Sequence, residues 1–162
     1  MTGLEDSEIG TSRYAGYQHG LKNNGLTPDG GLVYRGNYSY EAGLEGANYF
    51  LSLKQPPSAI ICANDAMALG AMKQFNRQGQ SIPNDISIIG FDDIEVASQI
   101  DPALTTVAAP VEEIARNAVE TLKNLIENKP PQHQHIALKA QLIIRQSCTW
   151  LKKATFKKAK AA

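Results

Sequence analysis

Two acidic residues, Asp92 and Asp93, follow a short apolar segment that ends at Gly90. In an open parallel sheet, ligands bind just beyond the carboxyl ends of the strands, and a glycine there lets the chain turn sharply. A carboxylate in that place can accept hydrogen bonds from a polar ligand. The pair does not predict general acid–base catalysis, because adjacent side chains usually point in different directions. The pattern indicates a binding site.

Other chemistries find little support in the sequence. It contains no G-x-S-x-G nucleophile motif, no H-E-x-x-H zinc motif and no G-x-x-x-x-G-K-[ST] phosphate-binding loop. His133 and His135 are spaced to share a metal ion, but further ligands are not evident, so we expect both imidazoles to be solvated. We therefore expect a protein that is not an enzyme and has no cofactor or metal.

Strand-like and helix-like segments alternate along the chain. Helices are predicted over 9–24, 39–53, 64–79 and 111–128, and strands over 32–34, 59–62, 86–89 and 142–145. Ser39 and Asn64 are suitable N-caps for the second and third helices. The strand 59–62 is predicted to be buried on both faces, as in a parallel sheet. This alternation predicts an α/β fold with a doubly wound, Rossmann-like sheet.

Helix 111–128 has the clearest amphipathic pattern of the chain. Its apolar side chains share one face, whereas its glutamates, Arg116 and Lys123 lie on the other. The apolar face is formed by Ile114, Ala115, Ala118, Leu122, Leu125 and Ile126. The glutamates are most simply the solvated side of the helix.

Composition indicates an ordinary globular chain. Its 162 residues are 43% hydrophobic and carry 16 basic and 16 acidic side chains, so bulk charge gives no reason to expect nucleic-acid binding. No apolar run reaches the roughly 18 residues of a membrane span. Two cysteines make no disulfide framework, and we expect reduced thiols and a cytoplasmic location. Residues 151–162 carry five lysines and no acid, and we expect this tail to be disordered.

Specific motifs carry a family resemblance. The run IPNDISIIGFDD and, twelve residues after Gly90, PALTTV resemble the lactose-repressor/galactose-repressor (LacI/GalR) family of bacterial transcription regulators. The segments SRYAGYQHGLKNNGL, PSAIICANDAMALGAMKQFNRQGQSIP and LIIRQS extend the resemblance over about residues 8–148. It implies a type I periplasmic-binding-protein-like fold, in which two Rossmann-like subdomains flank a cleft.

The resemblance covers only part of the family's length. It implies that residues 1–150 are an effector-binding fragment, with a C-terminal subdomain at about 8–104 and 132–148. Helix 111–128 would belong to the N-terminal subdomain. Family members begin with a helix-turn-helix region that this sequence does not match, so we expect operator DNA to be bound only through such a missing N-terminal domain. We also expect a homodimer.

The family pattern assigns ligand contacts to Arg13, Tyr38, Asn64 and Asp92. An aspartate accepts from hydroxyls, arginine and asparagine donate, and an aromatic ring covers apolar C–H surface, which suits a sugar or nucleoside-like effector. Other roles remain open for each residue. Asp92 or Asn64 could cap a helix, Tyr38 could be ordinary packing, and Arg13 could form a surface ion pair.

The effector predicted from the resemblance is a sugar. Relatives that bind purines carry a basic residue ahead of the arginine helix, where Ser7 and Glu8 stand here. The resemblance thus predicts the sensing and dimerising part of a LacI-type regulator. A sugar-binding protein of a transport system is the alternative, because it would use the same cleft but would need a secretion signal.

Overall fold

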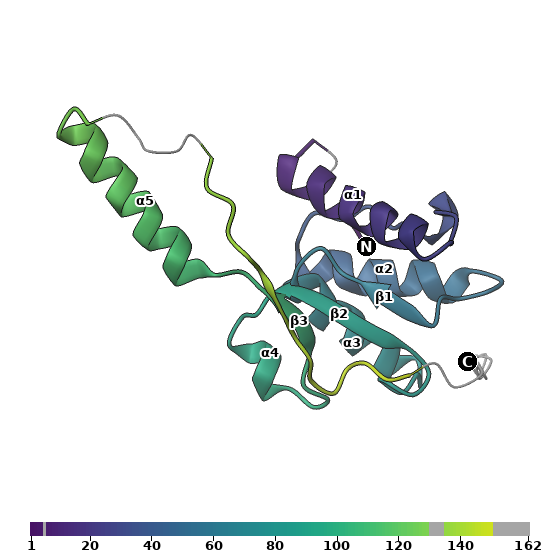
Figure 1. Ribbon diagram of the computed structural model, residues 1–162. Coiled ribbons are helices and arrows are strands. Elements are labelled where there is room, and N and C mark those ends of the chain that lie inside the picture. Colours follow the sequence, from purple (N-terminus) through teal and green to yellow (C-terminus); the bar gives the residue numbers. More distant parts are fainter. Residues whose placement is uncertain (5, 130–134, 151–162) are drawn as a thin grey trace.

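The computed structural model describes residues 1–4, 6–129 and 135–150. A four-stranded sheet forms its centre, in the order β1 (Ala59–Ile61), β2 (Ser87–Asp92), β3 (Thr105–Ala108) and β4 (Gln141–Ile143) (Figure 1). Strands β1, β2 and β3 are parallel, and β4 pairs with β3 in the antiparallel sense. The predicted α/β fold is confirmed.

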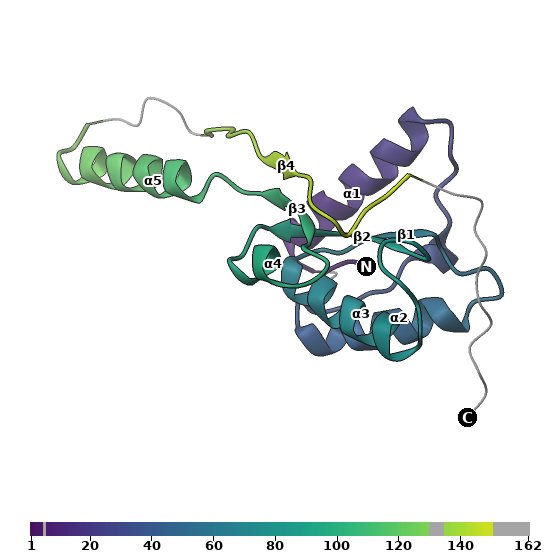
Figure 2. The same cartoon turned by 90° about the horizontal axis from the view of Figure 1, so that it is seen from below.

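Helices lie on both faces of this sheet. Five α-helices and one short 3-10 helix are described: α1 (Glu8–Asn23), η1 (Gly30–Leu32), α2 (Tyr40–Ser52), α3 (Asp65–Arg77), α4 (Val96–Gln99) and α5 (Val111–Ile126). Figure 2 shows α2 and α3 below the sheet and α1 above it. The arrangement places loops from both layers beside the carboxyl ends of β1 and β2.

The core lies between the sheet and the pair α2–α3. Ile60 and Ile88 point from the strands into this layer and are almost fully buried, as are Phe50, Met67 and Phe75 from the helices. The two helices approach closely because glycine stands at the contact. A Cβ on Gly43 would lie 2.1 Å from the carbonyl oxygen of Met67.

Side-chain caps fix where the three long helices of the body begin. Ser7 accepts a hydrogen bond from the N–H of Gly10 at 2.9 Å. Ser39 and Asn64 accept from the N–H groups three residues further on, each at 3.0 Å. Both predicted caps are confirmed, and each satisfies a backbone donor that the first helical turn leaves unpaired.

One predicted strand is absent, and the predicted burial of another was wrong. Residues 32–34 form no strand, because Asp29 caps the turn η1 and the only ladder contact nearby is an isolated bridge between Thr2 and Arg35. Strand β1 is covered on one face only, so Ile61 is 50% exposed while Ile60 is buried. An apolar run is compatible with one covered face as well as with two, so periodicity could not decide this point.

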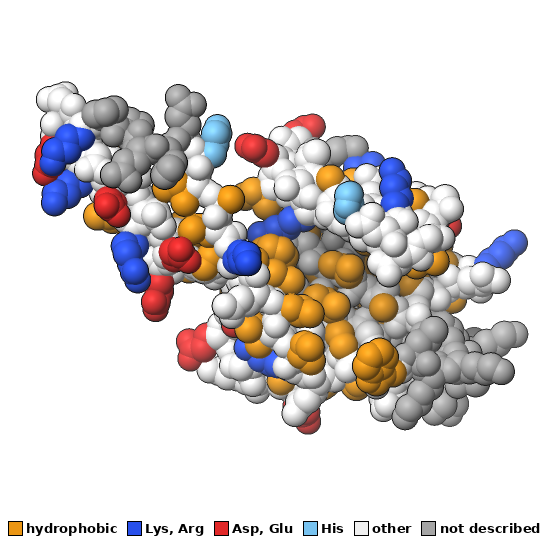
Figure 3. Space-filling view, viewed as in Figure 1, with side chains coloured by type: hydrophobic (Ala, Val, Ile, Leu, Met, Phe, Trp, Pro, Cys, Tyr) orange, Lys and Arg blue, Asp and Glu red, His pale blue; other side chains and the backbone are white. Residues whose placement is uncertain are grey.

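Helix α5 forms at the predicted position but projects from the body (Figure 1). None of its residues is buried, and Ile114, Leu122 and Leu125 are each about half exposed. Hydrophobic side chains are also visible over the sheet face seen in Figure 3. The described part of the chain therefore leaves two apolar surfaces uncovered.

Two expectations fall outside the described residues. The tail 151–162 and His133 are among the positions that are not described. Across the described helices, none combines the length and the apolarity that a membrane crossing requires.

Candidate functional site

The loop after β2 has an unusual backbone. Asp92 and Asp93 have φ angles of 113° and 57°, so two successive non-glycine residues adopt left-handed conformations. Such conformations are costly and persist only where the surroundings hold them. The result is that the two carboxylates diverge: Asp92 pairs with Arg13 on α1, and Asp93 pairs with Arg145 after β4.

Arg13 reaches the loop from the other layer of the molecule. Its Nη2 lies 3.1 Å from Oδ1 of Asp92, and the two side chains remain 25% and 39% exposed. The guanidinium also stacks on the ring of Phe91, 3.8 Å from the ring centroid, and donates through Nη1 to the carbonyl of Ala63. A cation held over an aromatic face and beside a carboxylate is fixed in direction as well as position.

Tyr38 lies where the start of α1 meets the start of α2. Its hydroxyl is 2.9 Å from the hydroxyl of Ser7, the N-cap of α1. The ring packs so closely against Gly3 that a Cβ there would lie 1.9 Å from the ring. Tyr38 has a φ of 68°, and its carbonyl accepts a hydrogen bond from Nδ2 of Asn64 at 2.9 Å.

The structure thus brings the four predicted residues to one edge of the sheet, with different local roles. Asn64 is the N-cap of α3 and also ties down the backbone of Tyr38. Asp92 does not cap the helix that follows, because α4 begins only at Val96 and has no side-chain cap. Its described partner is Arg13. Ligand contact by these residues stays a prediction.

Sequence reasoning missed two members of the site. Phe91 was recognised only as part of a motif, although its place on β2, one residue before Asp92, puts it beside the arginine. Asp65 was predicted only to lie within the helix 64–79, with no role of its own, yet its side chain is completely buried. Burial raises the pKa of Asp65, while hydrogen bonds from Thr106 and from the N–H of Ile94 oppose that shift.

A shallow cavity of about 240 Å³ adjoins Tyr38 through Gly3 and Gly10. Its walls also include Thr11, Tyr14 and Arg35. Neither Arg13 nor Asp92 lines this cavity, and both side chains are partly exposed. Within residues 1–4, 6–129 and 135–150, no cluster of three histidines, cysteines or acidic residues is placed to hold a metal ion.

A comparison with protein families decides the classification. The family model described as a periplasmic binding protein-like domain matches residues 1–148. The chain belongs to this family. Within it, the resemblance to LacI-type regulators is confirmed. The HTH-type transcriptional repressor CytR of Escherichia coli (strain K12) is 38% identical over 147 residues, which are 91% of this chain and 43% of the repressor.

Further relatives and solved structures agree with this classification. The ribose operon repressor of Haemophilus influenzae is 31% identical over 94% of this chain and 46% of its own. Among solved structures, the Escherichia coli repressor ascG has a TM-score of 0.82 at 34% identity, covering 90% of this chain and 53% of its own. A complex of the regulator CelR with cellobiose has a TM-score of 0.86 at 28% identity, covering 91% and 45%. The chain spans less than half the length of CytR and of the ribose operon repressor.

Proposed function

We propose that this chain is the effector-sensing part of a LacI-type bacterial transcription regulator, with no enzymatic activity of its own. The observation that carries the proposal is the grouping of Arg13, Phe91 and Asp92 at the carboxyl edge of the parallel strands. Ligands of open α/β sheets bind at this edge. The relatives compared above are named as transcription regulators, which favours this function over a transport protein.

The chemistry of the site favours a neutral, hydroxyl-rich effector. The carboxylate of Asp92 can accept from a hydroxyl, Arg13 supplies donors, and Phe91 and Tyr38 offer aromatic surface for the C–H face of a sugar ring. Asn64 has one amide hydrogen left for a ligand after its two structural bonds. The cellobiose bound by CelR has this chemistry.

The proposal assigns α5 and the rest of the chain to different subdomains. The body would be one wall of the effector cleft, and α5, which has no packing partner among the described residues, would belong to the opposite subdomain. Operator DNA would be bound by a region of the regulator outside these 162 residues. A regulator of this kind would act in the cytoplasm, as a dimer.

Ligand-observed NMR with the 162-residue chain tests the proposal, because it detects weak binding to a single wall of a cleft. The panel contains neutral sugars, including ribose and cellobiose, and nucleosides. One charge-assisted hydrogen bond contributes roughly 1.5–3 kcal/mol to the binding free energy. Its loss in Arg13→Ala or Asp92→Ala should therefore weaken binding by about 10- to 150-fold. Asp92→Asn should lose less, since an amide oxygen still accepts.

The matched control is Glu120→Ala, on the solvated face of α5, which should leave binding unchanged. Binding of a sugar with equal affinity by wild type and Asp92→Ala would contradict the proposed site. Failure of every sugar and nucleoside in the panel to bind wild type would contradict the proposed function.

A further inference from the structure

The Asp92 loop needs an external support. Two successive left-handed residues without glycine are unfavourable in isolation, and Asp92 and Asp93 retain these conformations in the fold. The orientation of the Asp92 carboxylate depends on this backbone, because a return of either residue to φ below zero would turn the side chain away from Arg13. Something other than Asp92 itself must hold the loop.

Asp65 is placed to provide that support. Its Oδ2 accepts a hydrogen bond from the N–H of Ile94 at 2.9 Å, and the backbone of Asp93 donates to the same carboxylate. Its Oδ1 accepts from the hydroxyl of Thr106 on β3 at 2.5 Å. The carboxylate therefore ties the loop after β2 to the start of α3 and to the neighbouring strand.

The carboxylate of Asp65 lies close against β2 in the interior of the fold. A Cβ on Gly90 would lie 2.0 Å from Oδ1 of Asp65, so the glycine of β2 is what lets the carboxylate approach the strand. Asp65 and Thr106 are both fully buried. Removing one partner therefore leaves the polar group of the other buried without this hydrogen bond.

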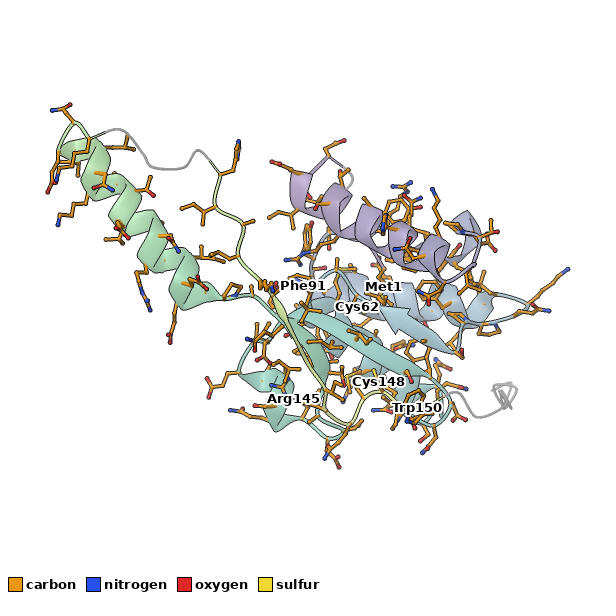
Figure 4. All side chains as sticks on the ribbon, in the orientation of Figure 1. Met1, Cys62, Phe91, Arg145, Cys148 and Trp150 are labelled. Atoms are coloured by element: carbon orange, nitrogen blue, oxygen red, sulfur yellow. The ribbon has the colours of Figure 1, made fainter. Side chains whose placement is uncertain are left out.

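A second anchor holds the loop from the opposite side. Arg145, which follows β4, pairs with Asp93 at 2.6 Å and donates to the carbonyl of Leu104 at 2.8 Å. Arg145 is labelled in Figure 4, close to α4. Arg145 fixes the side chain of Asp93, whereas Asp65 fixes the backbone on which Asp92 depends.

We propose that Asp65 is the positioning residue of the effector site. It does not touch the effector, but its buried carboxylate holds the loop in the left-handed conformation that presents Asp92. The inference rests on the proposed function only for the identity of what Asp92 binds. The conformational role of Asp65 is independent of any ligand.

The first experiment needs no ligand. Backbone chemical shifts and three-bond HN–Hα couplings of Asp92 and Asp93 report their φ angles in the folded 162-residue chain. We expect left-handed values in wild type and their loss in Asp65→Ala. The matched control is Asp85→Ala, which removes a carboxylate that accepts from the N–H of Ser81 at 2.8 Å in a distant loop. Retention of both left-handed residues in Asp65→Ala would overturn the proposal.

A gentler variant covers the case in which Asp65→Ala does not fold. Thr106→Val removes one hydrogen bond to Asp65 at nearly constant volume, and Thr106→Ser restores the hydroxyl. We expect Thr106→Val to shift the Asp92 and Asp93 signals toward ordinary φ values and Thr106→Ser to return them. A purely structural role of Thr106 would lower stability in Thr106→Val and leave the loop signals unchanged, which would also overturn the proposal.

The second experiment links position to binding, with ribose and cellobiose as probes. Partners that orient metal-binding side chains cost about 10- to 100-fold in affinity when removed. By the same logic we expect a loss of this order in sugar affinity from Asp65→Ala and from Thr106→Val. Unchanged affinity in a variant whose loop has moved would overturn the positioning role while the proposed function stands. If neither sugar binds wild type, the loop measurements still decide the role of Asp65.

Discussion

The guanidinium of Arg13 contacts three groups of different chemistry. It meets the carboxylate of Asp92, the ring of Phe91 and the carbonyl of Ala63. Only arginine combines a planar surface for stacking with several donors in a fixed arrangement. The side chain therefore joins the helix in front of the sheet to the loops at the ends of two strands, although the residues concerned are up to 79 positions apart in sequence.

The reactivity of the Cys62 thiol tests whether this side chain is buried as the structure shows. Burial raises the pKa of its thiol to about 11, and Figure 4 shows it beside Met1 in the interior. The thiolate is the reactive form, so Cys62 should resist iodoacetamide near pH 8 in the native chain. Cys148 is partly exposed and should react. Mass spectrometry of the alkylated peptides measures both sites.

The control is alkylation in urea, where both thiols should react because unfolding removes the burial. Equal native reactivity of Cys62 and Cys148 would contradict the buried position of Cys62. Neither oxidation nor metal binding is needed to account for a difference, since both cysteines are free thiols in the structure.

Which side chains meet at the site was only partly predictable from the sequence. The family motifs led to Arg13 and Asp92, which are in contact. The buried carboxylate of Asp65 was not foreseen, because its partners Thr106 and Ile94 are 41 and 29 residues away and nothing local signals them. Tertiary hydrogen bonds of this kind leave no periodic pattern in a sequence.

The α2–α3 pair is the element on which the body depends. Gly70 on α3 faces the chain at the start of α2, where a Cβ would lie 2.0 Å from the carbonyl oxygen of Tyr40. Gly70→Ala should therefore push the helices apart and reduce the free energy of unfolding by about 1–3 kcal/mol. Urea unfolding followed by circular dichroism measures the change.

Gly20 on α1 is the matched control, because a Cβ there would meet nothing within 4 Å. Gly20→Ala in an exposed helix should instead raise the free energy of unfolding by about 0.5–1 kcal/mol. Because the two substitutions should change the free energy of unfolding in opposite directions, the comparison distinguishes the effect of close helix packing from that of helix propensity. Equal stabilisation by both substitutions would show that the helices are not in close contact at Gly70.

Helices were easier to predict than strands for a physical reason. A helix is determined by its own cap and its own periodicity, so the starts of α2 and α3 at Ser39 and Asn64 could be predicted locally. A strand exists only if a partner pairs with it. Residues 32–34 have the composition of a strand, but their backbone neighbour is the short segment around Thr2, and no ladder forms.

At the scale of the molecule, α5 stands apart from everything else described. The sequence predicted its start and its amphipathic pattern, placed its end at 128 where the structure has Ile126, and gave no information on what covers the apolar face. Val111, Val119 and Ile126 are between 64% and 73% exposed. The apolar face of α5 forms a stripe along the helix that consists of Ile114, Ala115, Ala118, Leu122, Leu125 and Ile126. An exposed apolar stripe of this kind is a site for association.

We expect the chain to self-associate through this stripe. Burying it against a second copy removes apolar surface from water, which favours assembly at micromolar concentration. Light scattering coupled to size exclusion should give a mass above 17.6 kDa for wild type. Leu122→Glu combined with Leu125→Glu places two charges within the stripe and should shift the mass toward that of the monomer.

The control makes the same change in net charge on the opposite side of the helix. Arg116 and Lys123 are exposed on the polar face of α5, so replacing both with glutamine lowers the net charge equally and leaves the stripe intact. This variant should associate as wild type does. If it dissociates as fully as the Leu122 and Leu125 variant, charge repulsion and not the apolar stripe controls assembly. A wild-type chain that remains monomeric over the concentration range would mean that α5 remains uncovered in solution.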